Sequence, residues 1–211
     1  MKYTTLGKTG LKVSVVGLGG IPVQRTDKAE AVEIVKACME QGINYLDTAR
    51  GYTISEEYFG EAIKGNRDKW IIATKSMART YDAMKADIEI SLKNLQTDYI
   101  DLYQIHNPTA AELEQVLKPD GALAALMDAK AAGKIGHLGI TLHSVDLFRQ
   151  ALEFDWVETI MFPYILVEAQ GEDLIRICGQ KGIGFIAMKP LAGGAIEDAT
   201  LALRYICAND A

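Results

Sequence analysis

The sequence predicts an α/β fold in which parallel strands alternate with helices, and three observations support this prediction. Short apolar runs recur along the chain, and a segment with helical periodicity follows each of them. The runs begin at residues 15, 43, 70, 99, 135, 159 and 184, at intervals of 24 to 36 residues. A strand–helix–strand unit needs roughly 30 residues, and such alternation is typical of a parallel sheet covered by helices. An open doubly wound sheet and a (β/α)₈ barrel both fit this pattern.

The predicted strands are mostly apolar on both faces, as expected for strands that are covered on both sides of a parallel sheet. They lie at residues 15–20, 43–49, 70–76, 99–106, 135–141, 159–165 and 184–190. The opening segment "KYTTLGKTGLKVS" precedes them. It predicts a β-hairpin, because "GKTG" supplies glycine turn chemistry between two short β-rich stretches. A hairpin at this point would close the bottom of a barrel.

The predicted helices carry apolar residues on one face and recognisable end signals. In the first helix Ala31 and Val35 share a face, and Gly42 ends it as a C-cap would. Ser55 is predicted to be the N-cap of the second helix. The helices lie at residues 27–42, 55–65, 81–96, 120–134, 144–154, 171–182 and 198–210. The segment 106–121 is the longest connection, and we expect it to form part of the wall of a substrate site.

The composition argues against several classes of function. The net charge is −6 and no cluster of basic residues occurs, so we expect no nucleic-acid partner. No run approaches the roughly 18 apolar residues that cross a bilayer. The start "MKYTTLGKTG" has no apolar core, so we expect no secretory signal. Cys38, Cys178 and Cys207 fit neither a disulfide framework nor a metal site, and we expect reduced thiols in a cytoplasmic protein.

The glycines of "VVGLGGIP" resemble a dinucleotide fingerprint only superficially. Gly17 and Gly19 have the G-x-G spacing, but Pro22 stands where the third glycine belongs. The nearest candidate for the acidic residue of that fingerprint, Asp47, lies about 30 positions on instead of about 20. We therefore reject a Rossmann site and favour close approach of the backbone at Gly19 and Gly20 to a flat ligand.

Three consecutive predicted strands end on ionisable side chains. They are Asp47, Lys75 and His106, and Tyr52 follows Asp47 in a loop. In a barrel these side chains would converge at the carboxyl ends of the strands, where barrel enzymes keep their chemistry. A lysine beside a tyrosine stabilises the phenolate and lowers the pKa of the phenol. Such a set could protonate an oxyanion that forms on a substrate carbonyl while a nicotinamide supplies hydride.

The motifs around these residues resemble those of a known family. "LDTARGY", "IIATKS" and "DLYQIHNP" are similar to the three site motifs of the aldo-keto reductases. "TTLGKTGLKVSVVGLGG" resembles their N-terminal hairpin and first strand, "AAGKIGHLGIT" their fifth strand and "GIGFIAMKPLAGG" their seventh. The resemblance implies a (β/α)₈ barrel spanning residues 1–211 as a single domain, and reduction of an aldehyde or ketone with NADPH, or alternatively NADH.

The resemblance also implies a role for each member of the set. Tyr52 corresponds to the general acid, and Lys75 to the residue that lowers its pKa. Asp47 corresponds to the partner of Lys75, and His106 to the residue that orients the carbonyl. The implied partner is a small carbonyl compound, with neither a nucleic acid nor a membrane, and the oligomeric state is left open.

The cofactor contacts carry over less completely. Leu142 stands where many members have asparagine, Met161 where many have glutamine, and Met188 where many have an aromatic residue. "MKPLAGG" resembles a subgroup that often carries a C-terminal iron–sulfur extension, whose cysteines this chain lacks. The resemblance assigns cofactor contacts to Gly19, Gly20, Asp47, Thr141, Met161, Met188, Lys189, Pro190 and Leu191.

The end of the chain departs from the family pattern. A closed barrel usually takes ~250 residues, and this sequence ends at "LALRYICANDA", before an eighth strand. We therefore expect the barrel domain to be C-terminally incomplete, or its C-terminal part not to be ordered.

Two other classes of function compete with the reductase. The first is a nicotinamide-binding regulatory barrel without turnover. The second is an aldolase-type barrel in which Lys75 forms a Schiff base, although Asp47 beside it disfavours an uncharged amine.

Overall fold

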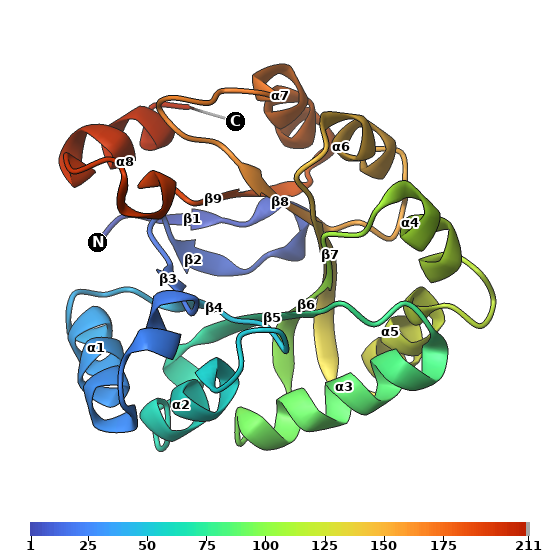
Figure 1. The fold of residues 1–211 in the computed structure, drawn as a ribbon, viewed down its shortest axis with the longest axis horizontal. Helices are drawn as coiled ribbons and strands as arrows, with labels where there is room; N and C mark the ends of the chain where they lie inside the picture. The colour runs from blue at the N-terminus through green and yellow to red at the C-terminus, as the bar shows by residue number, and fades with distance from the viewer. Residues whose placement is uncertain (210–211) are drawn as a thin grey trace. The chain divides into compact units, whose positions relative to one another are not determined.

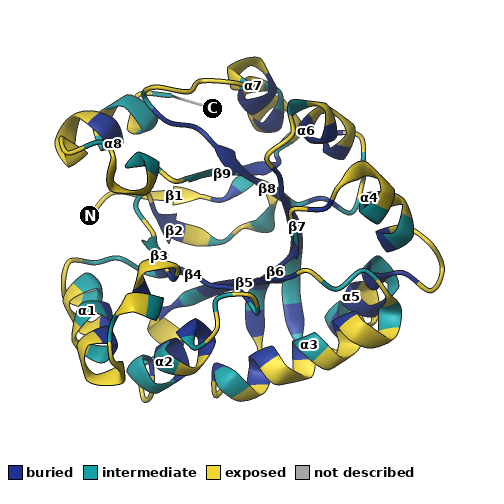
Figure 2. Ribbon diagram, in the orientation of Figure 1, coloured by how far each residue is buried: buried dark blue, intermediate teal, exposed yellow. Residues whose placement is uncertain are grey.

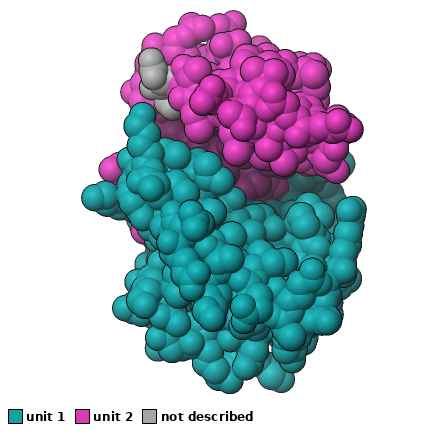
Figure 3. All heavy atoms as spheres, turned by 90° about the vertical axis from the view of Figure 1, so that its left-hand side faces the viewer, with its two compact units in different colours: residues 1–4, 12–138 teal, residues 5–11, 139–211 magenta. Residues whose placement is uncertain are grey.

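The computed structural model describes residues 1–209, and its chain divides into two compact units. Unit 1 comprises residues 1–4 and 12–138, and unit 2 comprises residues 5–11 and 139–211 (Figure 3). Within the described residues, no helix has the length and apolarity needed to cross a bilayer. The assignment of residues 1–211 to one domain stays a prediction.

Seven strands within residues 1–209 form one parallel sheet, and their order in the sheet follows the chain from β3 to β9 (Figure 1). Each lies inside a predicted run, which confirms the α/β class. A doubly wound sheet contains a point where the strand order reverses, and this order has none. The strands are β3 Leu18–Gly19, β4 Tyr45–Asp47, β5 Ile71–Ser76, β6 Ile100–His106, β7 Ile135–Thr141, β8 Thr159–Pro163 and β9 Gly184–Met188.

Besides part of the N-terminal hairpin, unit 1 contains strands β3 to β6, the first part of β7, and helices that turn one apolar face toward the strands. In α3, Met84, Ile88 and Leu92 recur at helical spacing and are buried, while the opposite side of the helix is exposed (Figure 2). This burial holds α3 against β5. The helices of this unit are α1 Lys28–Glu40, α2 Ser55–Ala62, α3 Tyr81–Asn94, α4 Ala110–Val116 and α5 Ala122–Ala131.

Unit 2 is built around an aromatic cluster. Phe148 of α6 lies 5.0 Å from Phe162 of β8 and 6.2 Å from Phe185 of β9, measured between ring centroids. These contacts fix α6 against the sheet, because aromatic pairs at 4.5–7 Å add to the burial of their area. The helices of this unit are α6 Val145–Ala151, α7 Glu172–Lys181 and α8 Ala199–Cys207.

The predicted N-terminal hairpin is present as β1 Tyr3–Thr5 and β2 Lys12–Ser14. Its turn contains Gly7 in a left-handed conformation with φ of +52°, and a Cβ there would lie 2.3 Å from the backbone nitrogen of Gly184. Glycine is therefore required for the turn to rest against the first residue of β9. The contact lies at the amino end of that strand, as expected for a hairpin below a sheet.

The structure differs from the sequence prediction at two places. The connection 106–121 contains helix α4, whose N-cap Thr109 and Glu112 form a reciprocal capping box. Ser55, predicted as an N-cap, is instead the first residue of α2, and Ile54 occupies the cap position. The Ser55 hydroxyl is buried and accepts a hydrogen bond of 2.8 Å from Thr48. Burial of this hydroxyl explains why it does not cap the helix.

Candidate active site

Unit 1 brings the four predicted catalytic side chains to neighbouring strand ends. Asp47 ends β4, Lys75 is the fifth residue of β5, and His106 ends β6. Tyr52 lies in the turn between β4 and α2. Residues paired across parallel strands point to the same face, and Lys75 pairs in register with Gln104, two positions before His106. Lys75 and His106 therefore share one face of the sheet.

Lys75 is a buried cation held by two oxygen atoms. Its Nζ lies 2.5 Å from Oδ1 of Asp47 and donates to the backbone oxygen of Thr48 at 2.8 Å. Only 1% of the residue is exposed. Burial raises the pKa of Asp47, and the positive charge of Lys75 opposes that rise. An amine that is buried and bonded to a carboxylate is a poor nucleophile, which disfavours the Schiff-base alternative.

Tyr52 lies against both Lys75 and His106. The Nζ of Lys75 is 4.8 Å from the centroid of the Tyr52 ring, and the His106 ring meets it edge-on at 5.9 Å and 85°. The predicted convergence of the four side chains is therefore observed, while their catalytic roles stay predictions.

The expected lowering of the pKa of Tyr52 is not found in the structure. Burial, and then the negative charge of Asp47, raise the pKa of Tyr52 above its ordinary value of 10.0. Burial disfavours the charged phenolate, and the negative charge of Asp47, which pairs with Lys75, adds to this effect. The phenol consequently keeps its proton at neutral pH.

Gln104 is a member of the site that the sequence prediction missed. Its Nε2 lies 3.4 Å from Oδ2 of Asp47, and its side chain is fully buried. Asp47 therefore contacts Lys75 with one oxygen and Gln104 with the other. The available signal was alternation along β6, which places Gln104 on the same face as His106.

The two predicted glycine contacts differ in their surroundings. A Cβ at Gly20 would lie 2.4 Å from the Ser55 hydroxyl and 2.9 Å from the Phe59 ring, so packing within unit 1 already requires glycine there. A Cβ at Gly19 would meet nothing within 4 Å. Gly19 also pairs in register with Asp47. Of the two, Gly19 leaves room for the approach of a ligand.

The remaining predicted cofactor residues lie in unit 2, within or just after strands β7, β8 and β9. Thr141 of β7 and Met161 of β8 pair in register, and both are buried. Met188, the last residue of β9, is partly exposed and pairs with Pro163. Thr141 and Met188 are thus the last residues of their strands, and Met161 lies in the middle of β8.

Lys189 follows β9 and presents a cation at the same end. The residue is exposed and has a positive φ of 60°, and its Nζ lies 3.0 Å from Nε2 of His143. Burial, and then the charge of Lys189, lower the pKa of His143. The Lys189 ammonium therefore donates a hydrogen bond to Nε2 of neutral His143, a contact that the sequence prediction did not anticipate. Pro190 and Leu191 follow and are partly exposed.

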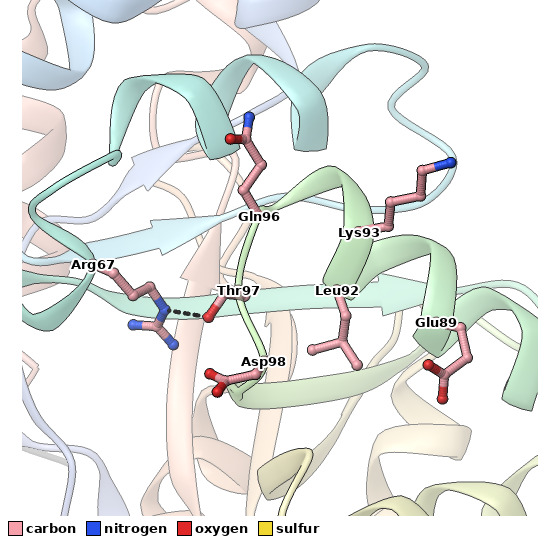
Figure 4. Close-up of a pocket in the computed structure, with 7 residues that line it drawn as sticks. All are labelled: Arg67, Glu89, Leu92, Lys93, Gln96, Thr97 and Asp98. Atoms are coloured by element: carbon pink, nitrogen blue, oxygen red, sulfur yellow. Dashed lines mark hydrogen bonds between the residues drawn. The ribbon is translucent and has the colours of Figure 1, made fainter.

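A surface hollow of about 650 Å³ lies elsewhere in unit 1, near the amino end of β6 (Figure 4). Its one arginine, Arg67, is already bonded to Thr97, Asp101 and the backbone oxygens of Trp70 and Tyr99. This guanidinium is therefore committed to the fold and is not available to a ligand. It is lined by Arg67, Glu89, Leu92, Lys93, Gln96, Thr97 and Asp98.

Comparison with known proteins identifies the family. The model of the aldo/keto reductase family matches residues 15–209, and the chain belongs to that family. The aldo-keto reductase YhdN of Bacillus subtilis is 35% identical over 194 residues, which are 83% of this chain and 57% of that protein. The L-galactose dehydrogenase of Arabidopsis thaliana is 31% identical over 218 residues, which are 94% of this chain and 68% of that protein. The chain thus spans 57% of the length of one of these relatives and 68% of the other.

Solved structures agree with this assignment. The holo form of aldo-keto reductase AKR11C1 from Bacillus halodurans superposes with a TM-score of 0.83 at 31% identity, covering 92% of this chain and 68% of that one. An aldo-keto reductase from Klebsiella pneumoniae in complex with NADPH gives a TM-score of 0.80 at 27% identity, covering 94% and 72%.

Proposed function

We propose that the protein reduces an aldehyde or ketone to an alcohol with NADPH as hydride donor, with NADH as the alternative. One observation carries the proposal: the Lys75 ammonium, paired with Asp47, lies 4.8 Å from the centre of the Tyr52 ring, against which the His106 imidazole also packs. A phenol beside a buried cation and an imidazole is suited to donate a proton to a carbonyl oxygen.

The chain's own residues would handle the proton. NADPH, when bound, supplies the hydride to the carbonyl carbon. The Tyr52 O–H donates its proton to the carbonyl oxygen as negative charge develops there. The raised pKa of Tyr52 keeps this proton in place until the stronger base, the developing alkoxide, accepts it. Lys75 then stabilises the phenolate, and His106 orients the carbonyl oxygen beside the phenol.

The residues present fit a nicotinamide dinucleotide. Gly19 offers open space on its Cβ side at the exit of β3. In unit 2, Lys189 provides an exposed cation suited to a phosphate group, and Thr141 ends β7 with a hydroxyl. We propose that Gly19, Gly20 and Asp47 in unit 1 contact this cofactor. In unit 2 we propose the contacts Thr141, Met161, Met188, Lys189, Pro190 and Leu191.

The wider predictions belong to the same proposal. We propose a (β/α)₈ barrel as the complete architecture, in which an eighth strand would follow the seven observed ones. We also propose a cytoplasmic location, since Cys38, Cys178 and Cys207 are all unpaired thiols. The substrate is a small carbonyl compound whose identity is set by residues around the site.

The direct test is oxidation of NADPH with a reactive aldehyde such as nitrobenzaldehyde, measured by loss of absorbance. The wild-type protein should turn over, and Tyr52→Phe should reduce kcat by about 10²- to 10⁴-fold while NADPH still binds. Wild-type protein that binds NADPH without turning over would instead support a regulatory barrel. Equal activity of wild type and Tyr52→Phe would refute the proposed general acid.

A further inference from the structure

A buried carboxylate lies on the opposite face of β5 from the catalytic lysine. Glu56, the second residue of α2, is only 1% exposed. Buried charges persist when they are paired and hydrogen-bonded, and both oxygens of Glu56 are satisfied by two donors each. The donors are Thr74 Oγ1 at 2.8 Å, Ser91 Oγ at 2.7 Å, Arg50 Nη1 at 2.7 Å and Asn94 Nδ2 at 3.2 Å.

Arg50 connects this carboxylate to the turn that carries the phenol. It lies between Asp47 and Tyr52 in the chain, and its backbone nitrogen donates to the backbone oxygen of Lys75 at 2.9 Å. Its guanidinium bonds Glu56 and lies 3.6 Å from a carboxylate oxygen of Asp87. Burial alone would lower the pKa of Arg50, but its hydrogen bond with Glu56 and the Glu56 charge raise it. Arg50 therefore stays bound to both acids.

The same two carboxylates, Glu56 and Asp87, accept hydrogen bonds from β5 residues on both sides of Lys75. Glu56 accepts from Thr74, and Asp87 accepts a hydrogen bond from Ser76. Successive side chains of a strand point to opposite faces, so Thr74 and Ser76 project away from the face on which Lys75 meets the phenol. One polar cluster of Arg50, Glu56 and Asp87 thus contacts both the segment of β5 that carries Lys75 and the turn that carries Tyr52.

We infer that Arg50 is a positioning residue: through Glu56 and Asp87 it fixes the turn bearing Tyr52 against the strand bearing Lys75. The inference rests on the proposed reductase function. The charge of Arg50 is balanced by two carboxylates, Glu56 at 2.7 Å and Asp87 at 3.6 Å. Its effect on the reaction must therefore pass through the distance between the phenol and the ammonium.

The test compares Arg50→Met with Arg67→Met. Arg67 is a matched control, because it also ties strands together through a carboxylate, Asp101 at 2.7 Å, but near the amino end of β6. Arg50→Met should lower kcat about 10- to 100-fold and leave KM within about 2-fold, because small displacements of reacting groups cost that much. Arg67→Met should lower the melting temperature while kcat stays within about 2-fold of wild type.

A double-variant cycle distinguishes positioning from general damage. If Arg50 acts through the phenol, adding Arg50→Met to Tyr52→Phe should cause no further loss of kcat. Full additivity of the two losses would overturn the inference, as would equal losses of kcat in Arg50→Met and Arg67→Met. Should Arg50→Met not fold, Arg50→Lys keeps one ion pair and should lower kcat several-fold. Wild-type kcat in Arg50→Lys would then count against the inference.

A readout without turnover separates this inference from the proposed function. In protein carrying ¹³C-labelled tyrosine, the ring resonance of Tyr52 is assigned by its loss in Tyr52→Phe. That resonance should move or broaden in Arg50→Met and stay in place in Arg67→Met, whether or not the wild type reduces an aldehyde. An unmoved Tyr52 resonance in folded Arg50→Met would overturn the inference even if the reductase proposal holds.

Discussion

Replacing Lys75 with methionine should destabilise the fold by an amount that depends on pH. Methionine fills most of the space of the lysine stem, so little of the loss comes from a cavity. The loss comes from leaving the Asp47 carboxylate buried without the Lys75 ammonium, whose Nζ lies 2.5 Å from Oδ1 of Asp47 in the wild type. Removing one partner of a buried pair costs about 3–5 kcal/mol. Because 14% of the Asp47 side chain is exposed, we expect about 3–4 kcal/mol at about pH 8.

The dependence on pH follows from the direction of the pKa shift. Burial already raises the pKa of Asp47 in the folded protein above its ordinary value of 3.8, and Lys75 opposes that rise. Without Lys75 the folded protein takes up a proton more readily than the unfolded chain. Relative to wild type, the stability lost in Lys75→Met is therefore smallest near and below about pH 4 and grows as pH rises through the folded pKa of Asp47.

Urea denaturation from about pH 4 to about pH 8 measures this effect, with the free energy of unfolding of wild type and variant compared at each pH. Adding Asp47→Asn to Lys75→Met removes the unpaired charge. At about pH 8 the double variant should regain at least about half of the lost free energy of unfolding. A loss below about 1 kcal/mol at about pH 8, or one that does not change with pH, would refute the reasoning.

Three further predictions follow from the geometry. Arg67→Met should lower the free energy of unfolding by about 2–4 kcal/mol in urea denaturation, since four hydrogen bonds are lost, and a loss under about 1 kcal/mol would contradict this. Gly20→Ala should lower the free energy of unfolding by about 1–3 kcal/mol, because its Cβ would lie 2.9 Å from the buried Phe59 ring. A Cβ at Gly19 would meet nothing within 4 Å, so Gly19→Ala should leave the free energy of unfolding within about 0.5 kcal/mol of wild type. Because the pKa of Tyr52 is raised, the kcat of reduction should show no fall below about pH 9, and an alkaline limb near about pH 7 would argue against this acid.

Strand positions were predictable because the sheet is buried on both faces. Each of the seven apolar runs contains a strand, and the ionisable residues at three exits meet as alternation implies. In such a sheet the strand ends are among the few places where an ionisable side chain can lie in the interior and still reach a ligand. The sequence alone therefore indicates Asp47, Lys75 and His106 as candidate site residues.

Contacts that depend on distance were not predictable. Helix α4 is only 7 residues long and buries one apolar pair, Leu113 and Val116, so periodicity alone indicates it weakly, although the spacing of Thr109 and Glu112 is that of a capping box. Ser55 has the chemistry of an N-cap, yet tertiary packing under Gly20 takes its hydroxyl into the interior. The direction of the Tyr52 pKa shift depends first on how deeply the phenol is buried and then on the nearby charge of Asp47, and no spacing along the chain reveals either.

The central claim is that Tyr52 donates a proton while hydride reaches the same carbonyl. The most direct measurement uses NADPH deuterated at the transferable position, with nitrobenzaldehyde as acceptor and mass spectrometry of the alcohol. We expect one deuterium on the carbinol carbon of the wild-type product and loss of that product, by about 10²-fold or more, in Tyr52→Phe. An alcohol formed without deuterium, or formed equally well by Tyr52→Phe, would contradict the account.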